Sequence, residues 1–481
     1  MVDKYVASVG GNKKMPPFSA SRKEREENKG CPRIGLEIHG YLMTNEKLFC
    51  KCKSEHGLKY SKPNTNICPI CTAQPGSKPL LPNKTAVDKI IQIGLILGCK
   101  INEKVVWQRK HYDWPDLPKG FQNTISGYYA QPNASNGKFL GIRITEIHLE
   151  EDPASWNPNK GEIDYNRSGC PLVEIVTEPD FKNSEQVIQW LKQLITTLNY
   201  IKAIDKKAGI KADVNVSVEG GKRIEIKNMN SLRNIKFAID SEIQRQKKDL
   251  PKKQETRMFD EAKGITIKMR SKEEAQDYRF VSEPDLPVLN VERKRIEKIK
   301  KSLPETPSEK LSKLIKKHKI AKHSAEILTK KLEVVEFFEK VIEKTNPKLA
   351  VRWVTEELLS VLNYNKKELE EVEINVNHFI ELLNLLEKNS ITELKAKEIL
   401  REFIPKSFSP KTDAKKHSQI SDDKSIKKFV EQVIKENGKA VSDYKAGKKE
   451  SLNFLIGQVM KLSNKRADYK TAREVLEELL K

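Results

Sequence analysis

Four cysteines have a spacing that suits a tetrahedral metal site. Cys50 and Cys52 form a C-x-C pair, and Cys68 and Cys71 form a C-P-x-C pair after 15 intervening residues. Proteins hold Zn²⁺ with two such close pairs, and four thiolates leave no coordination position open for water. The expected site is therefore structural. The first pair is tighter than the usual C-x-x-C, so four ordinary reduced cysteines remain the alternative.

A second group of residues is acidic. Glu37 and His39 stand two residues apart in an alternating run, and Glu150 and Glu151 close another strand-like run. Glu174 lies inside the apolar run PLVEIV, where a carboxylate is costly unless it is paired or binds a cation. If these segments are neighbours, their oxygens and one imidazole suit Mg²⁺, which also takes phosphate oxygens. The alternative is that each residue has a structural or solvated role.

The segment RKHYDWPDLPKGFQ joins basic and aromatic groups to two prolines that restrict the backbone. Such a rigid loop is able to meet a phosphate or a base, and Arg109, Tyr112 and Lys119 are its candidate contacts. The sequence has neither a Walker A run nor a G-x-G-x-x-G run, so a nucleotide would be held by a less common design. It also shows no Ser-Ser-Lys or Cys-His arrangement that would make the chain an amidase itself.

Strands are needed to bring these residues together. Alternation predicts strands at 34–39, 141–149 and 172–177 and a hairpin over 213–227, with helical spacing at 84–98 and 184–203. The hairpin turns at a Gly-Gly pair, which is a strong hairpin signal. Its valines and isoleucines point to one side, and its other face is wholly polar. That polar face indicates either a solvated surface or the lining of a wet cleft.

From residue 296 the pattern becomes helical and rich in Lys and Glu. We therefore expect a flexible extension at 1–30, an α+β body with mixed α/β elements at 31–295, an all-α helical domain at 296–405 and a small helical tail domain at 406–481. The tail has 18 Lys and Arg against 11 Asp and Glu. Its predicted apolar stripes suit a module that rests on RNA or a simple solvated face; they comprise Ile426, Phe429, Val430, Val433, Ile434, Leu455, Val459 and Leu462.

The 481-residue chain is strongly basic, with a net charge of +22. This charge favours a polyanionic partner such as nucleic acid, although a general preference for Lys would have the same effect. No apolar run approaches the roughly 20 residues needed to cross a bilayer. The seven cysteines, four of them clustered, suit a reducing compartment, and the cytoplasm is the expected location.

Ordered blocks of the sequence resemble one known family. The runs IGLEIHGYLMTNEKLFCKC, RKHYDWPDLPKGFQ, ITEIHLEEDPASW, DYNRSGCPLVEIVTEPD, KRIEIKNMNS and MRSKEEAQDYRFVSEPDLP are similar, in this order, to blocks of the GatB family. Its members are the B subunits of the tRNA-dependent amidotransferase. Near the C-terminus, DYKAGKKESLNFLIGQVMK is similar to the YqeY-like tail domain of that family. The resemblance covers about residues 33–481 and implies that the α+β body is a mixed α/β, cradle-like catalytic body.

The resemblance implies an enzyme that uses ATP and Mg²⁺ to phosphorylate the side-chain carboxylate of mischarged Asp-tRNA(Asn) or Glu-tRNA(Gln). Ammonia from the glutaminase of the complex, its A subunit, then displaces the phosphate, and a small C subunit joins the two larger ones. Family metal and gate positions match Glu37, His39, Glu150 and Glu151, with Mg²⁺ expected at Glu37, His39 and Glu151. The resemblance also implies that Glu174 is a further ligand, that Arg109, Tyr112 and Lys119 lie near the nucleotide or substrate, and that the helical and tail domains bind tRNA.

Two other classes of function compete with this interpretation. Basic charge and the cysteine cluster alone would fit a non-catalytic, zinc-stabilised RNA-binding protein. The acidic set of Glu37, His39, Glu150 and Glu151 argues against it, because a groove that only binds RNA has little use for carboxylates. A free-standing ligase that uses ATP and free ammonia is the second alternative, and failure to bind an amidase partner would favour it.

Overall fold

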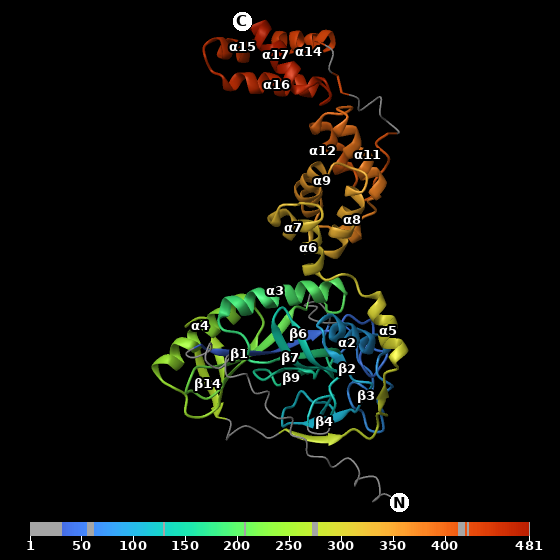
Figure 1. The fold of residues 1–481 in the computed structure, drawn as a ribbon, viewed down its shortest axis with the longest axis vertical. Coiled ribbons are helices and arrows are strands. Elements are labelled where there is room, and N and C mark those ends of the chain that lie inside the picture. The colour runs from blue at the N-terminus through green and yellow to red at the C-terminus, as the bar shows by residue number, and fades with distance from the viewer. Residues whose placement is uncertain are drawn as a thin grey trace, which may run out of the picture. The chain divides into compact units, whose positions relative to one another are not determined.

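The computed structural model describes residues 31–480 except 55–61, 128–129, 206–207, 272–277, 412–418 and 421–422. The extension predicted at 1–30 lies outside these residues. The chain forms two compact units, Met1–Pro304 and Glu305–Lys481. The first unit is built around a large sheet and the second is helical (Figure 1). The predicted fold class, an α+β body followed by helical domains, is confirmed.

The main sheet of the first unit has twelve strands within the described residues, and β1 (Arg33–Tyr41) lies near its centre. The strand order is β14-β13-β12-β11-β1-β10-β7-β5-β4-β15, with β2 and β6 attached beside β7. Each pairing is antiparallel except that of β12 with β13. The other bounds are β2 Lys100–Ile101, β4 Gln108–His111, β5 Gln122–Thr124, β6 Ala134–Phe139, β7 Ile142–Glu151, β10 Pro171–Thr177, β11 Ile210–Ser217, β12 Ile224–Met229, β13 Glu255–Asp260, β14 Ile265–Ser271 and β15 Arg279–Ser282.

Alternation along the strands divides the sheet into an apolar face and a polar face. Ile34, Leu36 and Ile38 of β1 are buried in the core of this unit, and so are Val214 and Val216 of β11. Helices that contribute to that core include α2 (Lys84–Ile96), α3 (Ser184–Tyr200) and α4 (Leu232–Lys248). Figure 1 shows α3 and α4 side by side along the sheet. The predicted strands, hairpin and both predicted helices are therefore present, and the polar face is left for a site.

Shorter elements complete the first unit. Two small ribbons pair β3 (Lys104–Val105) with β16 (Leu289–Asn290) and β8 (Ser155–Asn157) with β9 (Glu162–Asp164). Helix α5 (Arg293–Ser302) packs on α2 and buries Ile299 in the core. The compact unit therefore extends to Pro304, whereas the sequence pattern placed the change to the helical domain after residue 295.

The first part of the second unit consists of short helices. Helix α6 has a capping box between Thr306 and Glu309, which satisfies free N–H groups at its start. Helix α7 ends at Leu328 and helix α8 begins at Leu332. The bounds are α6 Pro307–Lys316, α7 Lys322–Leu328, α8 Leu332–Ile342, α9 Pro347–Arg352, the π-helix η2 Trp353–Leu358, α10 Leu359–Tyr364, the 3₁₀ turn η3 Leu369–Glu371, α11 Val376–Glu387 and α12 Glu393–Glu402.

Four more helices form a small bundle with its own core. They are α14 (Asp423–Glu436), α15 (Gly438–Lys445), α16 (Glu450–Leu462) and α17 (Tyr469–Leu480). Ile426, Val430, Val433, Leu455 and Val459 are buried in this core as predicted, and Phe429 and Ile434 pack against it. Leu462 was predicted to belong to the same apolar stripe, but it is 39% exposed at the last residue of α16. No helix among the described residues is long and apolar enough to span a bilayer.

Candidate active site

The polar face of the sheet carries a cleft of about 490 Å³. Strands β1, β4, β7, β11 and β12 contribute side chains to it, because each strand directs every second residue to this face. Its lining includes His39, Lys110, Tyr112, Glu150, Asp213 and Lys227. Residues far apart in the sequence thus meet on one surface, as the sequence analysis required for a site.

The first acidic cluster consists of His39, Glu150 and Glu174. Ligand atoms of the three residues lie within 4.8 Å of one another. The imidazole Nε2 of His39 is 3.6 Å from Glu174 and 3.9 Å from Glu150. Register explains the meeting, because His39 of β1 is directly opposite Glu174 of β10 and Glu150 of β7 is opposite Leu172 of β10. An imidazole with two carboxylates is a donor set that fits a divalent cation.

Burial and neighbouring charges act in opposite directions on this cluster. Burial would raise the pKa of Glu174, but His148 and His39 hold it well below its ordinary value. Burial and the charge of Glu174 raise the pKa of Glu150. His148, which is 1% exposed, supports Glu174 through a 2.8 Å contact from Nε2. A bound cation would relieve the repulsion between the two carboxylates.

The second acidic cluster consists of Glu37, Asp213 and Glu225, whose oxygens also lie within 4.8 Å of one another. Lys227 contacts Asp213 at 2.8 Å and Glu225 at 2.7 Å. Asn215 donates to Glu37 at 2.9 Å. Burial, followed by the charge of Glu174, raises the pKa of Glu37. From the sequence, Asp213 and Glu225 were expected only on the polar face of a hairpin. The register of β1 against β11, which sets Glu37 opposite Asp213, brings them into a cluster with Glu37.

Glu151 faces the other side of the sheet from Glu150, because the two are consecutive in β7. Its carboxylate pairs with Lys119 and accepts a 2.9 Å hydrogen bond from the backbone N–H of Asn123. Lys119, Asn123 and Arg109 line a separate pocket of about 330 Å³. Arg109 makes a two-pronged contact to Glu283 at 2.9 and 2.8 Å. Glu151, Arg109 and Lys119 therefore do not join the acidic clusters, whereas Tyr112 does line the cleft.

Comparison with known proteins identifies the family. Residues 32–297 match the family model described as the GatB/GatE catalytic domain, and residues 336–480 match the model described as the GatB domain. The chain belongs to the GatB family. The relative from Methanocaldococcus jannaschii is 42% identical over 470 residues, covering 93% of this chain and 98% of its own length. The relative from Methanothermobacter thermautotrophicus is 41% identical over 453 residues, covering 93% and 99%. Both are named as the B subunit of aspartyl/glutamyl-tRNA(Asn/Gln) amidotransferase.

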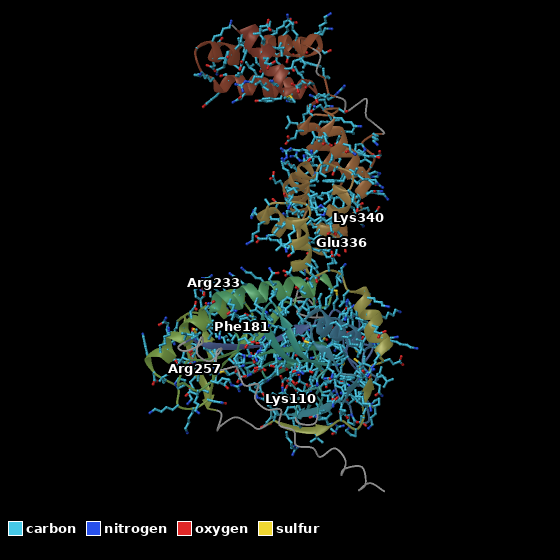
Figure 2. All side chains as sticks on the ribbon, in the orientation of Figure 1. Lys110, Phe181, Arg233, Arg257, Glu336 and Lys340 are labelled. Atoms are coloured by element: carbon cyan, nitrogen blue, oxygen red, sulfur yellow. The ribbon has the colours of Figure 1, made fainter. Side chains whose placement is uncertain are left out.

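Within residues 32–297, which match the catalytic-domain model, Lys110 is a cleft residue that was not predicted from the sequence of this GatB-family chain. Lys110 of β4, which Figure 2 labels, lines the cleft. Its ammonium lies 4.7 Å from the centre of the Tyr278 ring. Burial would lower its pKa, but the charges of Glu150 and Glu174 raise it, so the lysine is protonated. Alternation from Arg109 was the available signal, since only one of two consecutive strand residues faces the cleft.

The four predicted cysteines do converge in this GatB-family chain. The Sγ atoms of Cys50, Cys52, Cys68 and Cys71 lie within 4.8 Å of one another, and all four are free of disulfides. A contact with Cys50 lowers the pKa of the Cys71 thiol to about 5, which favours the thiolate form that binds metals. The donor set and its spacing fit a four-thiolate Zn²⁺ site without an open coordination position.

Proposed function

We propose that this GatB-family chain activates the side-chain carboxylate of Asp or Glu esterified to tRNA with ATP, and that ammonia then converts it to the amide. The observation that supports this proposal best is a pair of acidic clusters, His39–Glu150–Glu174 and Glu37–Asp213–Glu225, which both contribute to the lining of one cleft, through His39 and Glu150 and through Asp213. The names of the relatives, which specify aspartyl and glutamyl tRNA(Asn/Gln), support this substrate class. The proposed class of enzyme is a carbon–nitrogen ligase with glutamine as the amido donor.

The proposed reaction has two steps, because a carboxylate oxygen is a poor leaving group. First, the side-chain carboxylate attacks the γ-phosphorus of ATP, the bond to the bridging oxygen breaks, and ADP leaves. Second, ammonia attacks the carbonyl carbon of the acyl phosphate, the bond from that carbon to the phosphate oxygen breaks, and the nitrogen loses a proton. Products are the side-chain amide, phosphate and ADP.

The cleft residues have separate proposed roles in these steps. His39, Glu150 and Glu174 would hold one Mg²⁺, and Glu37, Asp213 and Glu225 would hold another. When bound, Mg²⁺ neutralises charge on the phosphate oxygens. Lys110, protonated and directed into the same cleft, supplies a fixed positive charge for the transferring phosphoryl group. This division differs from the sequence-based expectation of Mg²⁺ at Glu37, His39 and Glu151.

Glu151 has a different proposed role, at the entry of ammonia. Strands β5 and β7 pair directly only at Thr124 and Glu150, and beside that point the Asn123 N–H binds the Glu151 side chain. Asn123 is fully buried, and both polar atoms of its side chain lack a hydrogen-bond partner among the described residues. Such groups suit the transient binding of ammonia. We infer that ammonia from the glutaminase, or A subunit, passes the Lys119–Glu151 pair into the cleft, with the small C subunit joining the complex.

The remaining proposals concern stability, RNA and location. Zn²⁺ at the four cysteines would hold the loop that contains them next to the 330 Å³ pocket, since Ile70 and Ala73 line that pocket. The helical domain and the tail domain would bind the tRNA body, and the tail, residues 406–481, has 18 Lys and Arg against 11 Asp and Glu. The cytoplasm, where tRNA and a reducing potential coexist, is the proposed location.

The test is amidation of mischarged Asp-tRNA and Glu-tRNA with ATP, Mg²⁺ and ammonium in place of glutamine, with and without candidate partner subunits. We expect ATP-dependent product that is reduced by about 100-fold or more by Glu150→Gln, with tRNA binding retained. Exposed Glu162→Gln, on the β8–β9 ribbon, is the matched control. Binding of tRNA without any product, under every combination of subunits, would instead support the RNA-binding alternative.

A further inference from the structure

The four-cysteine cluster contains one pair of thiols that are placed to react with each other. Cys68 and Cys71 are separated by two residues, and their Sγ atoms lie 3.8 Å apart. Cys71 is buried, whereas Cys68 is half-buried and is open to a small solute. A disulfide bond needs its sulfurs at about 2.0 Å, so only a small movement separates this pair from one.

A tight turn holds the two sulfurs in this arrangement. The backbone N–H and the hydroxyl of Thr72 both donate to the carbonyl oxygen of Cys68, at 3.1 and 2.9 Å. The N–H of Cys68 in turn donates to Sγ of Cys71 at 3.2 Å. A hydrogen bond to sulfur favours the thiolate, which is both the form that binds metals and the form that attacks an oxidant.

Hydrogen bonds, more than apolar burial, hold the segment around this pair. Asn166, in the connection between β9 and β10, accepts the N–H of Asn66 at 2.9 Å. In the same connection, the Ser168 hydroxyl donates to the carbonyl oxygen of Cys71 at 2.8 Å. Ile67, by contrast, is 37% exposed. Because a single hydrogen bond contributes little net stability, a metal ion bound by the cysteines would be the strongest cross-link of this segment.

A buried lysine makes the segment depend on the charge of the cluster. Lys47 is 1% exposed, and its ammonium donates to the carbonyl oxygens of Asn66 at 3.1 Å and Tyr165 at 3.2 Å. Its backbone N–H binds the carbonyl oxygen of Cys52. Four thiolates around Zn²⁺ carry a net negative charge, which offsets this buried cation. Loss of that charge removes a stabilising interaction from the ammonium and favours exposure of the segment to water.

The segment is connected to the cleft and to the 330 Å³ pocket. Arg167 belongs to the same β9–β10 connection, and its Nε lies 3.0 Å from Oδ2 of Asp152. That oxygen also accepts the Tyr41 hydroxyl at 2.6 Å, and Asp152 and Tyr41 line the cleft. Ile70 and Ala73, next to the reactive pair, line the 330 Å³ pocket. Release of the segment would therefore disturb one wall of each hollow.

We propose that Cys68 and Cys71 are a reversible oxidation site, at which a peroxide forms a disulfide, the cluster loses its Zn²⁺ and amidation slows. The disulfide and the loss of metal stand apart from the proposed function, whereas the effect on amidation rests on it. The four cysteines are then a redox-sensitive cross-link between the metal site and the two hollows.

The oxidation is a two-electron reaction that uses one peroxide. The Cys68 thiolate attacks one peroxide oxygen, an S–O bond forms, the O–O bond breaks and hydroxide leaves. The Cys71 thiolate then attacks the sulfenic sulfur of Cys68, the S–S bond forms, the S–O bond breaks and a second hydroxide leaves. The two thiolates are oxidised and the peroxide is reduced. Two of the four ligands are lost, so the site no longer holds Zn²⁺.

The first measurement is metal release from the full, zinc-loaded chain in hydrogen peroxide, followed with a chromophoric chelator. We expect about one equivalent of Zn²⁺ to appear together with a Cys68–Cys71 disulfide in peptide mass spectrometry. Reduction with a dithiol in the presence of Zn²⁺ should restore the metal content. Cys31→Ser, at an exposed cysteine outside the cluster, is the control and should behave as the wild type.

A second variant separates metal binding from oxidation. Cys68→His keeps three thiolates and one imidazole, which is a common structural Zn²⁺ set, but removes the proposed disulfide. We expect its Zn²⁺ release in peroxide to be slower by about 10-fold or more, because the attacking thiolate is absent. If this variant binds no Zn²⁺, the position of the disulfide in the oxidised wild type decides the question. Release at the wild-type rate, or a wild-type disulfide at other cysteines, would overturn the assignment to this pair.

The effect on function is measured as ammonium-driven amidation by the complex before and after oxidation. We expect the rate to fall by about fivefold or more as Zn²⁺ leaves, and to recover with the dithiol and Zn²⁺. Retention of Zn²⁺ at peroxide concentrations that oxidise Cys31 would overturn the oxidation site. Loss of Zn²⁺ with an unchanged rate would overturn the link to the two hollows. Absence of ATP-dependent product from the untreated complex would instead refute the proposed function.

Discussion

At the scale of single residues, the face of the sheet to which a strand residue points decides which site it joins. Arg109 and Lys110 are consecutive in β4, and Glu150 and Glu151 are consecutive in β7. Lys110 and Glu150 line the cleft, while Arg109 lines the 330 Å³ pocket and Glu151 pairs with Lys119 there. A conspicuous run of sequence contains both members of such a pair, but it does not show which member faces the cleft.

Lys110→Gln is expected to lower kcat for ATP-dependent amidation by about 100-fold or more, which is typical for loss of one group that stabilises transition-state charge. The KM for tRNA should change little. Lys110→Arg keeps the charge and should recover part of the rate. Steady-state kinetics with ammonium as the nitrogen source measure this, with Lys138→Gln, an exposed lysine of β6, as control. Equal kinetics for the Gln variant and the wild type would exclude a role in phosphoryl transfer.

The cysteine cluster gives a second prediction at this scale. Cys71→Ser should release about one equivalent of Zn²⁺ and lower the free energy of unfolding, because metal binding to a preformed four-thiolate site is linked to folding. Metal analysis of the purified chain and urea unfolding measure both effects. Cys31→Ser, at an exposed cysteine outside the cluster, should change neither. Full metal content in the Cys71 variant would contradict a four-thiolate site.

At the scale of elements, α4 is tied to the sheet by a buried carboxylate. Glu242 is fully buried and contacts Arg245 at 2.7 Å, the Thr266 hydroxyl of β14 at 2.6 Å and Gln246 at 2.8 Å. Gln246 in turn binds backbone atoms at Val216 and Val218. Glu242 thus ties α4 to β14, and Gln246 extends the contact to the end of β11, the strand that carries Asp213.

Glu242→Ala is expected to destabilise the first unit by about 3 kcal/mol, because it leaves buried partners without their charge. Urea unfolding at pH 7 measures this, and Glu185→Ala, at an exposed ion pair, should have a much smaller effect. Burial would raise the pKa of Glu242, but Arg245, Thr266 and Gln246 lower it. The stabilisation is therefore fully present above the pKa of Glu242 in the unfolded chain, about 4.3. It is lost as the pH falls through the lower pKa of Glu242 in the folded chain. A pH-independent difference between variant and wild type would refute this linkage.

The elements were also the part of the fold that the sequence predicted best. Clean alternation in β1 and in the hairpin of β11 and β12, together with the helical spacing of α2 and α3, corresponds to real elements. Short strands such as β4, β5 and β15 have no period long enough to recognise, since each has three or four residues. The second acidic cluster required the register of β1 against β11. That pairing joins segments far apart in the chain and is not encoded in local pattern.

At the scale of the whole molecule, the proposed chemistry and the proposed tRNA-binding tail belong to different compact units. The catalytic family match and both acidic clusters lie in the first unit, whereas the four helices of 423–480 form a separate apolar core in the second. The chain's net charge of +22 is spread over both. We expect the rate of amidation to respond to changes in the first unit, and the affinity for tRNA to respond to changes in the tail of the second unit.

Removal of residues 411–481 tests this division. We expect the KM for mischarged tRNA to rise about 10-fold or more, with the KM for ATP unchanged, because the segment carries a clear excess of Lys and Arg but none of the cleft residues. The slope of log affinity against log salt should also become shallower, since each phosphate contact releases counterions. Filter binding at several salt concentrations and amidation kinetics measure both quantities.

A matched charge change separates electrostatics from loss of a folded module. Lys427→Gln/Lys428→Gln removes two exposed charges from α14, and Lys298→Gln/Lys301→Gln removes two from α5. If the tail rests on RNA, only the α14 pair should weaken tRNA binding and reduce the salt slope, by about one to two. Equal effects of the two pairs would mean that the basic charge acts as a general field. That result would contradict a direct contact between the tail and the tRNA phosphates.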